Sequence, residues 1–247
     1  MDLDGRVALV TGGGTGLGRE IALRMGRAGA RVAVNYSRSR DAAEQVAGEI
    51  ERDGGKALAV RADVADSAAV AEMVTTVERA LGPVDVLVNN AGITRYIPFS
   101  DIGAITEERW RRILDVNLTG AFLCAQAVAP GMVARSAGKI VNVATNSAFT
   151  STGSSIPYVV SKAALVSLTT CLARALAPAV QVNAVAPGWM ATDWLDRYLP
   201  SERAAEIRSG AVPLAPLEDV VDCVMGLVAN DSITGHVAVV DRGEMLG

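Results

Sequence analysis

Tyr158 and Lys162 stand four residues apart in the apolar segment Tyr158-Val159-Val160-Ser161-Lys162. Residues at this spacing share one face of a helix. A free tyrosine has a pKa of about 10, and a buried ammonium nearby favours the phenolate. Lowering the tyrosine pKa by roughly 3 units needs about 4 kcal/mol of differential interaction. The pair therefore predicts Tyr158 as a general acid or base near neutral pH, against the alternative of an accidental surface pairing.

A glycine-rich turn gives this pair a chemical context. The predicted strand 6–10 leads into Thr11-Gly12-Gly13-Gly14-Thr15-Gly16-Leu17-Gly18, after which a helical pattern begins. Gly12, Gly16 and Gly18 follow the spacing GxxxGxG, and the backbone N–H groups of a helix start bind pyrophosphate well. The order strand, glycine turn, helix favours dinucleotide binding over a merely tight turn.

The elements that must position these residues alternate along the whole chain. Short, nearly continuous apolar runs predict strands buried on both faces, and amphipathic stretches between them predict helices. The expected strands are 7–10, 32–34, 57–60, 84–88, 140–143, 180–186 and 237–240, and the expected helices are 16–28, 41–53, 67–81, 107–135, 156–176 and 217–230. This alternation predicts an α/β fold, a doubly wound parallel sheet of the Rossmann type with helices on both faces.

Composition restricts the function classes. At 247 residues and 50% hydrophobic, the chain suits one domain, 1–247, with a cofactor half at about 1–150 and a catalytic and substrate half at about 140–247. A net charge of −4 with scattered arginines argues against nucleic acid. Without a signal peptide or an apolar run of about 20 residues, we expect no membrane and a cytoplasmic location.

Metal and disulfide chemistry are not expected. Cys124, Cys171 and Cys223 are odd in number and widely spaced, so they predict buried small apolar side chains. The lone histidine, His236, makes both a histidine metal site and a Ser-His-Asp triad improbable.

Three more motifs stand in a consistent order: Asn89-Asn90-Ala91-Gly92, Asn117 within Asp115-Val116-Asn117-Leu118-Thr119-Gly120, and Pro187-Gly188. With the glycine turn and Tyr158/Lys162, the whole chain resembles the short-chain dehydrogenase/reductase family, nearest to its 3-oxoacyl-[acyl-carrier-protein] reductase-like members. The resemblance implies that Tyr158 protonates a carbonyl oxygen while a nicotinamide delivers hydride. It also implies that Lys162 holds the nicotinamide ribose and that Asn117 keeps a proton-relay water in place.

The predicted catalytic set is Asn117, Thr145, Tyr158 and Lys162. The predicted cofactor-binding set is Gly12, Thr15, Gly16, Leu17, Gly18, Ser37, Arg38, Asp63, Val64, Asn90, Ala91, Gly92, Tyr158, Lys162, Pro187, Gly188 and Thr192.

Two places depart from the family pattern. Thirteen residues before Tyr158 the family usually has serine, and this chain has Thr145, whose hydroxyl offers the same donor and acceptor capacity. Ser147 is the alternative for that role. The tail Val240-Asp241-Arg242-Gly243 replaces a usual double glycine, and segment 213–219 is short. These departures concern the nicotinamide end of the expected site.

Cofactor preference follows from the end of the second strand. An acid there holds the ribose 2′-hydroxyl of NAD, whereas a 2′-phosphate needs an arginine without a competing carboxylate. Here the chain reads Asn35-Tyr36-Ser37-Arg38-Ser39-Arg40, with no acid before Asp41. Arg38 and Ser37 therefore predict NADPH/NADP, with NAD as the alternative.

The family resemblance implies that the segment after Pro187-Gly188 closes over a substrate. Ala191, Trp194, Leu195, Tyr198 and Leu199 fall on one helical face, which favours a hydrophobic ketone or secondary alcohol, with ordinary packing as the alternative. The predicted substrate residues are Tyr96, Ser147, Trp189 and Trp194. No basic residue lies between Arg174 and Arg197, so an acidic carrier-protein substrate is less favoured.

Other functions stay open at this level. A dinucleotide-binding redox sensor would lack the acid and base set. An NAD-dependent sugar or polyol dehydrogenase is less consistent with the apolar lid. A sugar-nucleotide epimerase needs a larger C-terminal region. The family resemblance implies a homotetramer or homodimer formed through the long helices.

Overall fold

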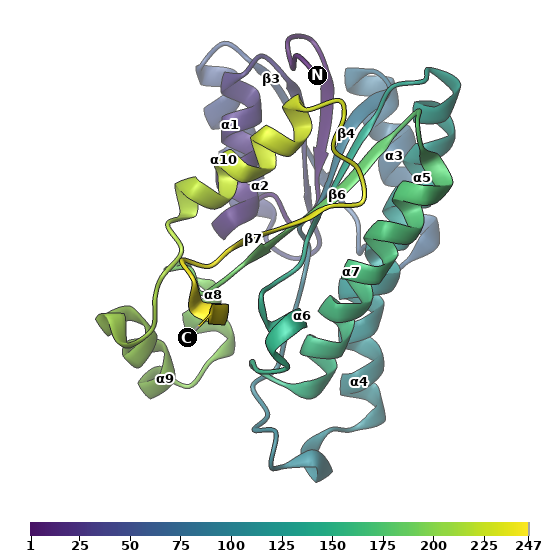
Figure 1. Cartoon of the computed structure of the whole chain (residues 1–247). Helices are drawn as coiled ribbons and strands as arrows, with labels where there is room; N and C mark the ends of the chain where they lie inside the picture. The colour runs from purple at the N-terminus through teal and green to yellow at the C-terminus, as the bar shows by residue number, and fades with distance from the viewer. Residues whose placement is uncertain (247) are drawn as a thin grey trace.

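A computed structural model describes residues 1–246. Within them, seven parallel strands form one sheet in the order β3-β2-β1-β4-β5-β6-β7 (Figure 1). The strands are β1 (Val7–Val10), β2 (Arg31–Tyr36), β3 (Lys56–Arg61), β4 (Val84–Asn89), β5 (Lys139–Val143), β6 (Gln181–Pro187) and β7 (Val237–Val240). Every expected strand is present, and β2 and β3 each extend beyond the apolar runs because backbone pairing continues from Arg31↔Lys56 to Tyr36↔Arg61.

Helices cover both faces of the sheet. On one face lie α1 (Gly16–Arg27), α2 (Arg40–Arg52) and α10 (Leu217–Ala229); on the other lie α3 (Ser67–Leu81), α4 (Glu107–Leu114), α5 (Gly120–Ala134) and α7 (Ile156–Leu176) (Figure 1). Each face of the sheet has its own hydrophobic core, and alternate residues of β1 belong to the two cores. Ala8 and Val10 pack with α1 and α10, while Val7 and Leu9 pack with α3 and α5. The doubly wound α/β fold is confirmed.

The expected helix 107–135 is interrupted. A π turn at Asp115–Thr119 separates α4 from α5. Such a turn adds a residue to the helix and redirects the side chains within it. Here it carries Asn117, whose amide bonds to the backbone of Ile93 in a different segment.

Two helical stretches, Glu107–Ala134 and Ile156–Leu176, are long and apolar enough to cross a membrane by length and composition alone. Both lie against the sheet, where Cys124, Ala125 and Val128 of α5 and Ala173 of α7 belong to a buried core. Packing against the sheet accounts for part of this apolar character, since 44% and 39% of the two apolar windows are buried.

Short helices gather at the carboxyl ends of the strands. They are α6 (Ser147–Thr150), α8 (Trp194–Tyr198) and α9 (Ser201–Glu206), followed by a π turn at Ile207–Ala211 (Figure 1). The segment that follows β6 and precedes α10 in the chain has a small hydrophobic core of its own, formed by Leu195, Leu199, Ala204 and Ile207. This lid, residues 189–214, therefore packs partly on itself.

The order in which strands are added to the sheet reverses at β1, because β2 and β3 extend the sheet to one side and β4 to β7 extend it to the other. Ligands of open parallel sheets bind beside the carboxyl ends at such a switch point. The fold thus brings the glycine turn, the loop after β4 and the start of α7 to one edge.

Candidate active site

A cavity of about 720 Å³ lies at this edge of the sheet. It collects most of the predicted site residues, from segments that follow β1 to β6. Those that line it are Gly12, Thr15, Gly16, Leu17, Ser37, Arg38, Asp63, Val64, Asn90, Ala91, Gly92, Thr145, Ser147, Tyr158, Lys162, Pro187, Gly188, Trp189, Thr192 and Trp194. Gly18, Asn117 and Tyr96 do not line it, and each has a different place.

The glycine turn depends on close backbone packing. Gly12 and Gly16 have φ angles of 61° and 53°, in the left-handed region that favours glycine. A Cβ on Gly18 would lie 2.4 Å from both the Gly12 oxygen and Asn90 Nδ2. Gly18 therefore packs behind the turn, and the amino end of α1 stays open to the cavity, as a pyrophosphate would require.

Two asparagines brace this turn from neighbouring strands. Asn90 Nδ2 donates to the carbonyl oxygens of Thr11 and Gly12 at 3.0 and 3.1 Å. Asn35 Oδ1 accepts from the Gly12 N–H at 3.3 Å, and the Gly13 N–H donates to the Asn35 carbonyl at 3.0 Å. The turn is held from both sides before any ligand binds.

Charged groups gather beyond the ends of β2 and β3. Ser37 and Arg38 are exposed at the cavity, and Arg112 of α4 donates to Asp63 Oδ2 at 2.7 Å. Burial acts to raise the pKa of the Asp63 carboxyl, but Arg112, the Ala65 N–H and the charge of Arg38 outweigh it, so that pKa lies below its usual value. This end of the cavity suits a ligand that carries negative charge.

Tyr158 and Lys162 share one face of α7, as the spacing predicts, and both line the cavity. Burial raises the pKa of Tyr158 to about 12; a hydrogen bond with Thr145 acts in the opposite direction, and Tyr198 adds to the rise. Burial lowers the pKa of Lys162 to about 8.

The expectation that Lys162 brings the Tyr158 pKa down is therefore wrong for this state of the cleft. Lys162 Nζ donates to the Val143 carbonyl at 2.6 Å, and the loss of water around the phenol dominates. At neutral pH Tyr158 keeps its proton, which is the form that a proton donor needs.

Asn117 lies behind the cavity, 1% exposed. Its Oδ1 accepts from the Ile93 N–H at 2.8 Å, and its Nδ2 donates to the Ile93 carbonyl at 2.9 Å and to Ser161 Oγ at 3.0 Å. A Cβ on Gly92 would lie 3.5 Å from Asn117 Oδ1 and 3.6 Å from Lys162 Nζ. The missing side chain of Gly92 is what keeps this space open between Asn117 and Lys162.

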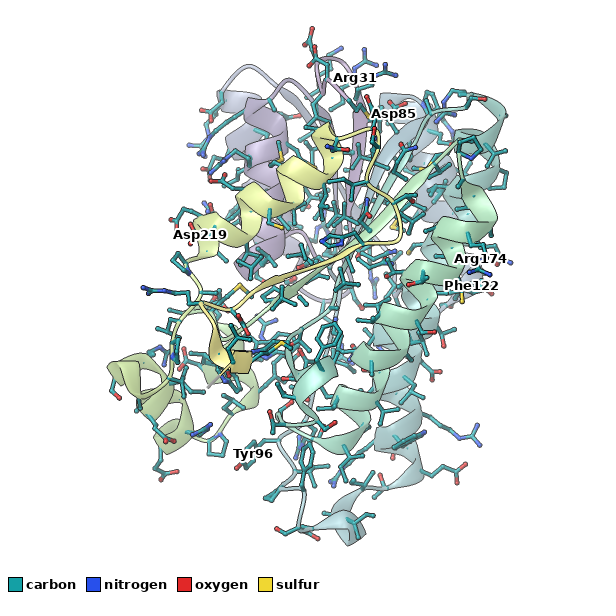
Figure 2. All side chains as sticks on the ribbon, in the orientation of Figure 1. Arg31, Asp85, Tyr96, Phe122, Arg174 and Asp219 are labelled. Atoms are coloured by element: carbon teal, nitrogen blue, oxygen red, sulfur yellow. The ribbon has the colours of Figure 1, made fainter. Side chains whose placement is uncertain are left out.

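The lid covers Tyr158 with aromatic rings. The Trp194 ring centroid is 6.0 Å from that of Tyr158, with planes tilted by 46°, and Tyr198 lies 4.4 Å from Trp194 at 53°. Tilted pairs at such distances are favourable. Tyr96 is 39% exposed and does not line the cavity; it lies in the lower part of the molecule in Figure 2.

Several cavity residues were not predicted. Thr94 and Ser154 are buried and join their hydroxyls at 2.6 Å, and Asn146, Arg112, Arg197 and Tyr198 complete the wall. Thr94 lies two residues after the motif Asn89-Asn90-Ala91-Gly92, and Asn146 directly follows Thr145, so closeness in the chain was an available signal for both. No sequence signal pointed to Arg112, because its partner Asp63 is 49 residues away in the chain.

Groups of three or more His, Cys, Asp or Glu that could hold a metal ion are not found in residues 1–246. The cavity instead offers backbone N–H groups, hydroxyls, amides and cations. These groups suit an organic ligand with phosphates at one end and a carbonyl or hydroxyl at the other.

Comparison with known proteins gives a consistent result. The sequence model of a family described as "short chain dehydrogenase" matches residues 6–203. A protein of Streptomyces violaceoruber named "Granaticin polyketide synthase putative ketoacyl reductase 2" is 41% identical over 246 residues, covering 97% of this chain and 96% of that protein. A 3-oxoacyl-[acyl-carrier-protein] reductase of Synechocystis sp. is 36% identical over 251 residues, covering 99% and 98%.

Among solved structures, a gluconate 5-dehydrogenase from Burkholderia cenocepacia in complex with NADP and tartrate superposes with a TM-score of 0.89. The two sequences are 31% identical, and the match covers 99% of this chain and 97% of that one.

Proposed function

The chain belongs to the short-chain dehydrogenase/reductase family and is an NAD(P)-dependent oxidoreductase, and from this premise we propose that it reduces a ketone to a secondary alcohol with NADPH. Tyr158 is the proposed proton donor. The observation that carries the proposal is the position of Tyr158, which interacts with Thr145 and Trp194 and lines the same cavity as Lys162 and the glycine turn.

The chain's own residues divide the work. The nicotinamide, when bound, supplies the hydride. The Tyr158 hydroxyl transfers its proton to the substrate oxygen, and the Thr145 hydroxyl helps to hold that oxygen and the phenolate left behind. Lys162, at 4% exposure, brings a cation to the same pocket, and Asn117 fixes the Ile93 backbone beside it.

NADPH is favoured by the charge at the end of β2. Arg38 is exposed to the cavity, and the nearby Asp63 is already paired with Arg112. A 2′-phosphate therefore meets a cation without a free carboxylate in competition. The gluconate 5-dehydrogenase structure, which holds NADP, is consistent with this preference.

Arg38→Ala tests the cofactor preference. We expect its dissociation constant for NADPH to rise about 10-fold or more, because a charge-assisted hydrogen bond is lost, while NADH binding changes little. Arg40→Ala is the matched control, since Arg40 binds Glu44 at 2.7 Å. Tighter binding of NADH than of NADPH by the unaltered protein would contradict the proposal.

The proposed substrate is a hydrophobic ketone or a 3-oxoacyl compound. The aromatic rings of Trp194 and Tyr198 over Tyr158 support an apolar substrate, as do the ketoacyl and 3-oxoacyl reductases among the relatives. A second candidate is a polyhydroxy acid, favoured by the buried hydroxyl pair of Thr94 and Ser154 and by the likeness to gluconate 5-dehydrogenase.

Two wider properties belong to the same proposal. We place the protein in the cytoplasm because Cys124, Cys171 and Cys223 are free thiols, as a reducing compartment would keep them.

We also propose a homodimer or homotetramer, since α5 and α7 present apolar side chains to solvent.

The first experiment follows nicotinamide absorbance with NADPH and a panel of hydrophobic ketones, 3-oxoacyl thioesters and keto sugar acids. Turnover should fall about 1,000-fold in Tyr158→Phe, which keeps the ring that packs on Trp194 but loses the proton. The substrate class that turns over decides between the two candidates. Tight NADPH binding without turnover of any ketone, or of any alcohol with NADP, would favour the redox sensor.

A further inference from the structure

The C-terminal turn that departs from the family pattern folds back toward the proposed active site. Buried Asp241 accepts hydrogen bonds from the N–H groups of Gly243 and Met245 at 2.9 and 3.0 Å. Arg242 and Gly243 both have positive φ angles, 56° and 81°. The resulting tight turn aims the carboxylate of Glu244 at the loop that follows β5.

Glu244 reaches this loop across a glycine. Asn146 Nδ2 donates to Glu244 Oε2 at 2.9 Å. A Cβ on Gly188 would lie 2.8 Å from the same Glu244 oxygen and 2.9 Å from Asp241 Cβ. Gly188 thus leaves the space through which the C-terminal turn contacts Asn146.

A carboxylate only accepts hydrogen bonds, so Glu244 fixes the orientation of the Asn146 amide. With Nδ2 toward Glu244, the Oδ1 atom faces Thr145, whose Oγ1 lies 3.4 Å away. Asn146 is 5% exposed, and its N–H donates to the Pro187 carbonyl at 2.9 Å. Both ends of this side chain and its backbone are therefore held.

We infer that Glu244 is a positioning residue for Thr145 and acts through Asn146; this inference rests on the proposed function. Thr145 has one hydroxyl proton, and Asn146 Oδ1 and the Pro187 carbonyl, at 3.3 Å, compete for it with the oxygen of Tyr158. Without Glu244 the amide is free to rotate and to present an N–H to Thr145. The hydroxyl would then be turned relative to Tyr158 and to the substrate oxygen.

Glu244 does not line the cavity, so its effect is separable from ligand contact. We expect Glu244→Ala to lower kcat for the ketone about 10-fold, with the dissociation constant for NADPH and the Tm nearly unchanged. Glu244→Gln should restore most of kcat, because its amide oxygen still accepts from Asn146. Leu246→Ala, at a side chain 92% exposed, is the control for change in the C-terminal segment.

The closing experiment combines Glu244→Ala with Thr145→Ala. If Glu244 acts through Thr145, the double variant has the kcat of Thr145→Ala alone. A double variant whose loss of kcat is the product of the two single losses would overturn the inference. A Glu244→Gln variant with the same loss of kcat as Glu244→Ala and a lowered Tm would also overturn it. If Glu244→Ala is fully active while Tyr158→Phe and Thr145→Ala are inactive, the inference about Glu244 is wrong and the proposed function stands. If Tyr158→Phe and Thr145→Ala are themselves fully active, the proposed function is wrong as well.

Discussion

At the scale of single residues, burial controls the proton affinities in this cleft. The phenol of Tyr158 lies under Trp194, and the ammonium of Lys162 is almost enclosed between α7 and β5. Each group is shifted toward its neutral form, with a pKa of about 12 for Tyr158 and about 8 for Lys162. Tyr158 therefore keeps its proton at neutral pH, beside a lysine whose pKa lies close to physiological pH.

Lys162 makes stability depend on pH in a predictable direction. Its pKa is 10.5 in an unfolded chain and about 8 in the fold, so between these values the unfolded chain binds more protons. The free energy of unfolding should rise from pH 8 to pH 10.5 by an amount on the order of 3 kcal/mol from this group.

Chemical denaturation of the cofactor-free protein across this pH range checks the slope. Lys162→Met supplies the comparison, because it keeps the aliphatic stem and removes the titration. Equal slopes for the two proteins would show that burial does not shift the Lys162 pKa.

At the scale of elements, the junction of β1, the glycine turn and α1 works by backbone contact. Asn90 from the end of β4 donates to the turn, and Gly18 of α1 packs directly beneath it. Any side chain at Gly18 would force these segments apart, and the N–H groups of the turn would lose their arrangement.

Gly18→Ala should therefore destabilise the protein by roughly 1–3 kcal/mol and weaken NADPH binding, because the new methyl group overlaps Gly12 and Asn90. Gly48→Ala is the matched control: Gly48 lies inside α2, and a Cβ there meets no atom within 4 Å. Alanine in a helix is favoured over glycine by up to about 1 kcal/mol, so this control should be neutral or more stable. Denaturation curves and NADPH titrations of both variants decide the matter.

At the scale of the whole molecule, one helix layer remains uncovered. Phe122 of α5 and Val160 of α7 are 40% and 39% exposed. Figure 2 shows Phe122 and Arg174 on the outer helix layer, on the opposite side of the sheet from Asp219. Apolar side chains on an exposed helical layer are suited to contact with a second copy of the chain.

Phe122→Glu should shift the protein to a smaller assembly, because a buried carboxylate without a partner is costly at an interface. Light scattering coupled to size-exclusion chromatography measures the mass. Ile102→Glu, at a side chain 72% exposed in the short 3-10 helix Ile102–Ala104 outside this layer, is the control and should leave the mass unchanged. An unaltered protein that is already monomeric would contradict the proposed oligomer.

The sequence alone predicted the parts of this molecule that depend on local spacing. The spacing of four positions from Tyr158 to Lys162 places both on one face of α7, and alternating apolar runs predict the sheet and its two helix layers. The glycine turn was recognisable because its position between β1 and α1 follows directly from chain order.

Tertiary structure alone decided what depends on residues far apart in the chain. Asp63 and Arg112 are 49 residues apart, Thr94 and Ser154 are 60, and Asn146 and Glu244 are 98. It also reversed the expected shift of the Tyr158 pKa, because burial of the phenol raises that pKa more than the hydrogen bond with Thr145 lowers it. Spacing fixes which side chains share an element, but burial and long-range hydrogen bonds follow only from how the elements pack.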